Sequence, residues 1–95
     1  MRIYISGPIT GNPTAHADFA GAVEFVRGKG HSPVNPFDCY PGSDYQEAMR
    51  ADIAAMLGCE AIYLLPGWEH SAGARLEFLV AEACGLKIIY SGGLR

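Results

Sequence analysis

The chain has 95 residues, of which 49% are hydrophobic, and its 7 basic and 10 acidic residues give a net charge of −3. That composition is typical of a globular protein and excludes a disordered one. No apolar run approaches the roughly 18–20 residues that span a bilayer, and no signal segment opens the chain. We therefore expect a soluble cytoplasmic protein without a membrane partner. The lack of a basic run argues against duplex DNA or RNA.

The first half of the chain predicts two strands with a helix between them. Residues 2–6 are a short β-rich run that stops at Gly7-Pro8. Over residues 16–27 apolar side chains recur at helical spacing, and the glycines that follow end this helix. Residues 32–35 are a brief extended piece, closed by Pro36.

A second helix is predicted from a capping box, with Ser43 at the N-cap and Gln46 at N3, and it ends before Gly58. Its inward side chains are expected to be Tyr45, Met49, Ile53 and Met56. Residues 60–65 then predict a buried strand.

Ser71 can cap a third helix that stops at Gly85, and residues 87–90 are the last predicted strand. The core-facing side chains of this helix are expected to be Leu76, Leu79, Val80 and Ala83.

The order β-α-β-α-β-α-β predicts a three-layer α/β/α, doubly wound parallel sheet of four strands in one domain, 1–95. We expect the strand order 2-1-3-4, as in flavodoxin-like or Rossmann-like folds. Ligands of such sheets bind beyond the carboxyl ends of the strands, where the winding direction reverses. The predicted rim therefore comprises residues 6–11, Asn35-Pro36 and residues 66–73.

Small size also predicts self-association, because a three-layer fold of this length leaves little spare stability. We expect a homodimer or a higher homo-oligomer. The apolar side chains expected to be left uncovered on the second and third helices are Tyr45, Met49, Met56, Phe78 and Cys84.

The first rim loop, Ser6-Gly7-Pro8-Ile9-Thr10-Gly11, combines two glycines with two hydroxyls directly after a strand. This suits close approach of the backbone to a phosphate or a sugar. The loop lacks the GK[ST] ending of a Walker motif and the spacing of GxGxxG, so a simple strand-to-helix turn stays an alternative.

Glu77 is the candidate chemical centre. It follows the cap Ser71 by six residues, and Gly73 lies one turn before it on the same helix face. The start of the helix favours an anion, and glycine at 73 is expected to leave Glu77 open to a ligand. A surface glutamate is the alternative.

Asp52 stands among inward residues of the second helix, and a solvated helix face is its alternative. Two carboxylates in one pocket can divide acid and nucleophile roles. Trp68 is a candidate to stack on a base, whereas Tyr63 is expected in the core.

Neither a metal nor an organic cofactor is expected. The histidines show no ligand spacing, and an odd number of widely spaced cysteines disfavours both a disulfide framework and a zinc site. These residues are His16, His31 and His70, and Cys39, Cys59 and Cys84.

Several segments together resemble the DUF4406 proteins, small members of the nucleoside 2-deoxyribosyltransferase-like superfamily. They are residues 4–11, 34–36, 50–52, 61–68 and 71–77. The resemblance covers nearly the whole chain in the same motif order. Characterised members of the superfamily are nucleoside 2-deoxyribosyltransferases and deoxynucleoside 5′-monophosphate N-glycosidases.

The resemblance implies a glutamate nucleophile that attacks the anomeric carbon of the sugar, at Glu77, with its acidic partner at Asp52. The sugar and phosphate contacts of the glycosidases fall on Ser6, Gly7, Ile9, Gly11, Ser71 and Gly73, and Pro8, Asn35 and Trp68 complete the predicted rim. Where the glycosidases have a small residue, this chain has Arg75, which either clamps a phosphate or obstructs the sugar site.

The implied function is an N-glycosidase or deoxyribosyltransferase acting on a nucleoside or nucleotide. Fold does not fix function, so two alternatives remain: a module that binds a nucleotide or an ADP-ribose-like signal without cleaving it, and a structural oligomer with a relict pocket. The transferases are longer than this chain, and C-terminal residues of a neighbouring subunit help to close their pocket.

Overall fold

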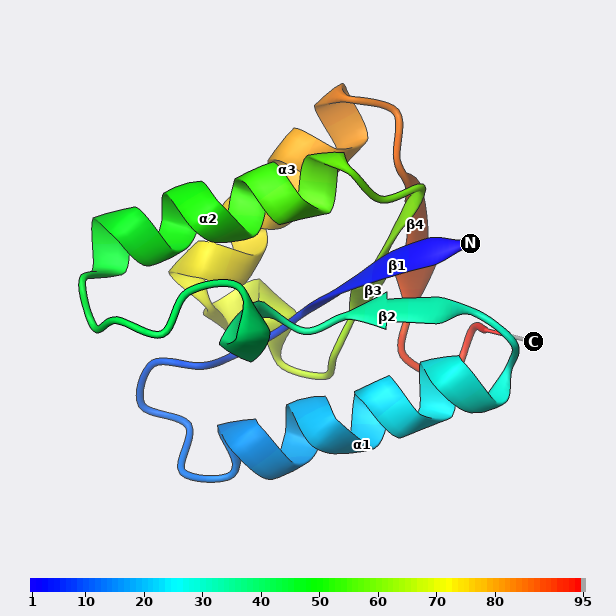
Figure 1. Ribbon diagram of the computed structural model, residues 1–95, viewed down its shortest axis with the longest axis horizontal. Coiled ribbons are helices and arrows are strands. Elements are labelled where there is room, and N and C mark those ends of the chain that lie inside the picture. Colours follow the sequence, from blue (N-terminus) through cyan, green and yellow to red (C-terminus); the bar gives the residue numbers. More distant parts are fainter. Residues whose placement is uncertain (95) are drawn as a thin grey trace.

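The four strands form one parallel sheet in the order β2-β1-β3-β4, which confirms the predicted topology. The computed structural model describes residues 1–94 (Figure 1). The strands are β1 (Arg2–Ser6), β2 (Ser32–Val34), β3 (Ala61–Leu64) and β4 (Lys87–Tyr90).

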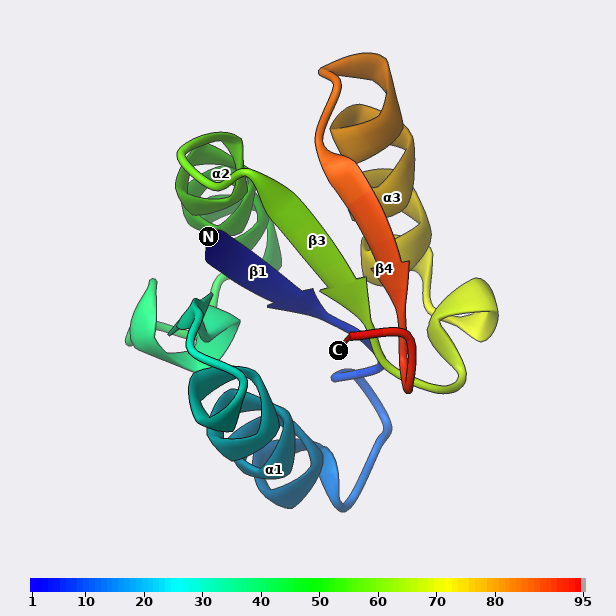
Figure 2. The same ribbon diagram turned by 90° about the vertical axis from the view of Figure 1, so that its right-hand side faces the viewer.

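Helices cover both faces of the sheet (Figure 2). On one face lies α1 (Ala15–Gly28), and on the other lie α2 (Tyr45–Leu57) and α3 (Ala72–Ala83). Two short 3₁₀ helices, η1 (Pro36–Asp38) and η2 (Trp68–His70), follow β2 and β3. None of the helices within residues 1–94 has the length and apolar character to cross a membrane.

Strand alternation divides the side chains of β1 between two cores. Ile3 and Ile5 point to the core beneath α1, with Phe19 and Val26. Tyr4 points to the core beneath α2 and α3, where it packs with Met56, Ile62, Leu64 and Ala81. Ser6 therefore also faces α2 and α3, and it is 1% exposed.

The register of the two central strands brings their carboxyl ends together. Ser6 pairs with Leu64 in the parallel ladder, so the loops that follow β1 and β3 leave the sheet side by side. The backbone of Leu65 donates to the carbonyl of Ser6 over 2.8 Å. The fold thus creates a rim at the reversal of the winding direction, between β1 and β3.

The start of α2 differs from its prediction. Asp44, not Ser43, is the N-cap, and its carboxylate accepts from the backbone N–H groups of Gln46 and Glu47. Asp and Ser are equally good N-cap residues. The Ser43-Asp44 pair therefore does not determine, from sequence, which of the two positions caps the helix. Tyr45, expected inside, is 56% exposed, because it lies in the first turn beyond the end of the sheet.

The buried face of α3 also differs from its prediction. Ala74, Glu77 and Ala81 are the buried residues of this helix, whereas Leu76 and Leu79 are 46% and 58% exposed. The small side chains of Ala74 and Ala81 let α3 lie close to the sheet and to α2. The expectation of an inward face was therefore wrong for Leu76, Leu79 and Ala83, which are exposed, whereas Val80 is half-buried and packs against the core.

Two of the apolar side chains expected to be left uncovered are already covered within the chain. Met56 is fully buried and Phe78 is partly buried in the core beneath α2 and α3.

Candidate active site

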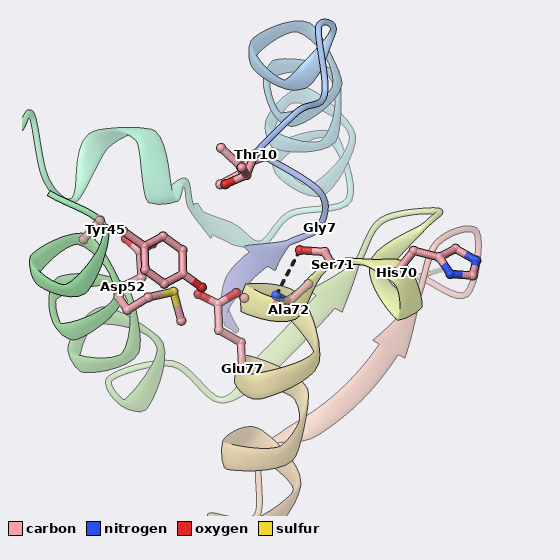
Figure 3. Close-up of a pocket in the computed structure, with 13 residues that line it drawn as sticks. Gly7, Thr10, Tyr45, Asp52, His70, Ser71, Ala72 and Glu77 are labelled. Atoms are coloured by element: carbon pink, nitrogen blue, oxygen red, sulfur yellow. Dashed lines mark hydrogen bonds between the residues drawn. The ribbon is translucent and has the colours of Figure 1, made fainter. Parts of the chain in front are cut away.

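A pocket of about 570 Å³ opens at the carboxyl ends of β1 and β3 (Figure 3). Its walls come from the loop after β1, from α2 and from η2 with the start of α3. The lining residues are Gly7, Ile9, Thr10, Tyr45, Ala48, Met49, Asp52, His70, Ser71, Ala72, Gly73, Ala74 and Glu77. This volume lies within the range of about 300–1,000 Å³ that small-molecule sites occupy.

Glu77 reaches this pocket from the second turn of α3, and it is 5% exposed. Both of its carboxylate oxygens accept a hydrogen bond from β1. The hydroxyl of Tyr4 donates to Oε2 over 2.7 Å, and Ser6 Oγ donates to Oε1 over 2.7 Å. Two buried donors on the same face of β1 therefore fix the orientation of the carboxylate.

Burial raises the pKa of Glu77 to about 7. The hydrogen bonds from Ser6 and Tyr4 lower this pKa, and the charge of nearby Asp52 raises it further, but desolvation is the largest effect. Burial also raises the pKa of Tyr4 far above its ordinary value, so its hydroxyl stays protonated and acts as a donor.

Asp52 lies on the buried face of α2 and is 7% exposed. Within residues 1–94 its Oδ1 is buried without a hydrogen-bond partner. Desolvation raises the pKa of this carboxyl to about 6. A buried acceptor without a partner is costly, and because Asp52 lines the pocket, a bound molecule can supply the missing donor.

The two rim segments that follow β1 and β3 meet at this pocket. Gly7, Ile9 and Thr10 line one side of it, and Ser71 to Gly73 line the other. Ser71 caps α3, since its Oγ accepts from the backbone N–H of Ala74 over 3.2 Å. The positive end of the α3 dipole therefore faces the pocket, opposite the first loop.

Gly73 keeps the middle of the pocket open, though not in the expected way. A Cβ at this position would lie 3.5 Å from the Tyr45 hydroxyl and 3.5 Å from Met49 Sδ. A larger side chain would therefore close the space between α3 and α2. It would not chiefly cover Glu77, as the sequence suggested.

Other predicted rim residues lie outside the pocket. Asn35 caps η1, where its Oδ1 accepts from the backbone of Phe37 over 3.1 Å. Trp68 and Arg75 line a second groove, on the outer side of α3. Pro8 and Gly11 belong to the first loop, but neither is among the lining residues.

The pocket and the buried contacts behind it include residues that the sequence did not single out. Tyr4 was not singled out because it looks like an ordinary core tyrosine of a strand. Its position two residues before Ser6 does indicate that both side chains face the same side of the sheet. Tyr45 was assigned to the core, and its side chain instead stands on the pocket wall (Figure 3). His70 lines the pocket but points away from the two carboxylates (Figure 3).

Across residues 1–94, no three His, Cys, Asp or Glu side chains are grouped closely enough to hold a metal ion. The three cysteines are free: Cys59 is buried, Cys39 half-buried and Cys84 exposed. What the pocket offers a ligand is two carboxylates, the start of a helix and a glycine-containing loop.

Comparison with solved structures places the fold among the 2-deoxyribosyltransferase structures. A 2-desoxiribosyltransferase from Leishmania mexicana matches with a TM-score of 0.75 at 23% identity, over 94% of this chain and 62% of that chain. The 2-deoxyribosyltransferase of Bacillus psychrosaccharolyticus matches with a TM-score of 0.75 at 14% identity, over 95% and 71%. The chain thus spans 62% of the length of the Leishmania protein.

A CMP N-glycosidase from Clostridium botulinum matches with a TM-score of 0.70 at 21% identity, over 95% of this chain and 70% of that chain. At these identities the likeness shows the shared fold. The family is shown by sequence: residues 1–90 match the model of DUF4406, described as a domain of unknown function, and the chain belongs to that family. No curated protein matches the chain.

Proposed function

We propose that this protein cleaves the N-glycosidic bond of a nucleoside or nucleotide, with Glu77 as the nucleophile. The observation that carries the proposal is the buried Glu77 carboxylate, held by the hydroxyls of Tyr4 and Ser6 where it meets the pocket. A carboxylate fixed at both oxygens is positioned for attack, which removes much of the entropic cost of the reaction.

In the proposed reaction a Glu77 oxygen attacks C1′ of the sugar and forms a glycosyl ester. The bond from C1′ to the base nitrogen breaks, and its electron pair leaves with the base. A proton from Asp52 or from water neutralises the departing base. Water then attacks C1′ and gives its proton to the Asp52 carboxylate or to solvent; the bond from C1′ to the Glu77 oxygen breaks, its electron pair restores the Glu77 carboxylate, and the sugar leaves. If a second base attacks in place of water, its nitrogen loses the proton in the same way and the transfer is complete.

The two carboxyls predict a narrow pH range for this reaction. Attack needs Glu77 ionised, whereas proton donation needs Asp52 protonated. Burial raises the pKa of Glu77 to about 7 and that of Asp52 to about 6, so the pair holds one shared proton near these pH values. We therefore expect a bell-shaped pH–rate profile centred between these values, reporting the coupled titration of the pair.

Two further observations support the proposal. Asp52, whose Oδ1 is buried without a partner within residues 1–94, lines the same pocket as Glu77, so a bound base or sugar is the donor we propose for this oxygen. The solved structures that share this fold include proteins named as 2-deoxyribosyltransferases and a CMP N-glycosidase. The name of the CMP N-glycosidase specifies the kind of bond proposed here.

The test is release of free base from a panel of ribo- and deoxyribonucleosides and their 5′-monophosphates, followed by chromatography. Glu77→Gln keeps the shape of the side chain but cannot form the ester, so turnover should fall by at least about 10³-fold. Glu82→Gln, at an exposed position of the same helix, is the matched control and should turn over normally. Intact-mass spectrometry of quenched wild-type enzyme should detect protein with a sugar attached.

Base release by Glu77→Gln at the wild-type rate would contradict the mechanism. If no member of the panel is cleaved but one is bound tightly and recovered unchanged, the pocket belongs to a binding module for nucleotides or related signals. The Glu77→Gln variant also binds in that case, because its shape is kept.

A further inference from the structure

The loop that follows β1 supplies one wall of the pocket. Ile9, which is 37% exposed, and Thr10 line the pocket from this loop, and Figure 3 shows Thr10 across the pocket from Glu77. Both belong to a tight turn, in which the backbone N–H of Asn12 donates to the carbonyl of Ile9 over 3.1 Å. Gly11 has a φ of 74° in this turn, a conformation that glycine adopts without strain. The position of the turn therefore decides where this wall lies.

The base of the same loop is held by the segment that follows β3. An added Cβ at Gly7 would lie 2.8 Å from Leu65 Cβ, and an added Cβ at Gly67 would lie 3.3 Å from Pro8 Cγ. The two segments are therefore in direct contact, and glycine permits this close approach. The contact fixes the base of the loop, and the turn follows it in the chain.

The side chain of Asn12 joins the turn to the start of the loop and to α1. Its Nδ2 donates to the carbonyl of Pro8 over 2.9 Å and to Asp18 Oδ2 over 3.1 Å. Its Oδ1 accepts from the backbone N–H of Thr14 over 3.2 Å and from the Thr14 hydroxyl over 3.1 Å. Since a backbone N–H can only donate, the bond from Thr14 sets which end of the Asn12 amide faces Pro8.

The start of a helix does not account for all of these bonds. The bond that the backbone of Thr14 donates is the ordinary Asx turn that precedes a helix. Asp18 lies in the first turn of α1, so the bond to its carboxylate joins the cluster to that helix. The bond to Pro8 points the other way, across the turn, and it encloses Ile9 and Thr10 between two hydrogen bonds.

We propose that Asn12 is a positioning residue of the pocket, which holds the wall formed by Ile9 and Thr10 in its binding geometry before a molecule enters. The inference rests on the proposed function for the class of that molecule, a nucleoside or nucleotide. A wall that is already ordered costs little loop entropy when the molecule binds, so preorganisation raises affinity. The lining residues include Ile9 and Thr10 but not Asn12, so Asn12 acts through the turn and not on the reacting atoms.

Three variants separate the bond to Pro8 from the rest of the cluster. Asn12→Ala removes every side-chain bond of Asn12. The double variant N12D/D18N exchanges the two side chains across their contact, which keeps a bond between them and an acceptor for Thr14 but removes the donor to Pro8. Thr14→Val is the matched control, because it removes hydroxyl bonds of the same cluster and leaves the bond to Pro8 intact.

The first measurement is amide hydrogen exchange in the free protein, followed by NMR. The N–H of residue 12 closes the turn. After correction for its intrinsic rate, it should exchange at least about tenfold faster in Asn12→Ala and in N12D/D18N, because the turn opens more often without the bond to Pro8. The amides of the central strand β1 report unfolding of the whole domain and should not show this acceleration. Thr14→Val should exchange as the wild type does.

The second measurement uses the nucleosides and 5′-monophosphates of the panel described above. For the member that wild-type protein cleaves fastest, Asn12→Ala and N12D/D18N should raise KM about tenfold and leave kcat within about twofold, the pattern of lost binding without lost chemistry. If members are bound but not cleaved, calorimetry with the tightest of them should show the same increase in Kd. Thr14→Val should keep the wild-type value in either assay.

Unchanged exchange of the turn in Asn12→Ala would overturn the inference, as would an equal acceleration throughout β1, which indicates a general loss of stability. An unaltered KM in this variant, or a fall in kcat at constant KM, would also overturn it. A panel that is bound without turnover refutes the proposed cleavage alone, since exchange and calorimetry need no reaction. A panel that is neither bound nor cleaved would overturn both proposals.

Discussion

Removal of one buried hydroxyl tests how the site controls its central carboxylate. Tyr4→Phe keeps the ring, which is fully buried beneath α2 and α3, and deletes only the donor that lies 2.7 Å from Glu77 Oε2. The hydrogen bond from Ser6 to Oε1 remains. The change therefore isolates one interaction with the ionised form of Glu77.

The expected magnitude follows from the charge on the acceptor. A hydrogen bond to a charged group contributes about 1.5–3 kcal/mol, against roughly 1 kcal/mol for a neutral pair. Since 1.36 kcal/mol corresponds to one pKa unit, the pKa of Glu77 should rise from about 7 by roughly one to two. The unfolding free energy should fall more at high pH, where Glu77 is ionised, than at low pH, where it is neutral.

The assay is a carbon NMR titration of the Glu77 side-chain carboxyl in wild type and variant, joined to urea unfolding well below and well above its pKa. Tyr63→Phe is the control, because it removes another buried tyrosine hydroxyl, one that faces the opposite core beneath α1. An unchanged Glu77 pKa in Tyr4→Phe, or an equal change in Tyr63→Phe, would refute this account of the site.

Three further predictions concern stability and the pocket. Burial raises the pKa of Glu77 from 4.5 to about 7, so between these pH values the folded state holds a proton that the unfolded state has lost. The free energy of unfolding should therefore fall by about 3 kcal/mol as pH rises through this range. The Glu77→Gln variant should lack this part of the pH dependence in urea unfolding. Gly73→Val should weaken the binding of any pocket ligand in calorimetry, because the valine side chain fills the space between α3 and α2. Gly21→Val is the control: Gly21 lies on α1 with nothing within 4 Å of an added Cβ, so binding should be unchanged. Equal affinity of the two variants would contradict the assigned pocket. Gly7→Ala places a Cβ 2.8 Å from Leu65 Cβ and should lower the unfolding free energy by about 1–3 kcal/mol, and an unchanged denaturation midpoint would show that the loop yields.

The sequence by itself determined the order of the elements and hence the sheet. Glycine and proline end each regular segment, and the alternation of short β-rich runs with helical periodicity leaves a parallel sheet as the consistent arrangement. The alternation is compatible with more than one strand order; the expected order 2-1-3-4, common in flavodoxin-like sheets, is the one observed, and it brings the loops after β1 and β3 to one pocket. The order of the elements depends on local spacing, which a single sequence contains.

Only the tertiary structure decided which side of each helix is buried. On α3, Leu76 and Glu77 are neighbours in sequence and point about 100° apart, and hydrophobicity alone favours the leucine as the inward residue. Small residues on the other side, Ala74 and Ala81, bring α3 close to the sheet and turn Glu77 inward.

The central contact of the site joins residues 73 positions apart, Tyr4 and Glu77. Neither residue type signals it, since a strand tyrosine is ordinarily core and a helix glutamate is ordinarily exposed. Burial and the partner hydroxyls together set the pKa of Glu77, and both arise only when β1 and α3 pack. The sequence therefore named the candidate residue, and the packing of the chain decided its environment.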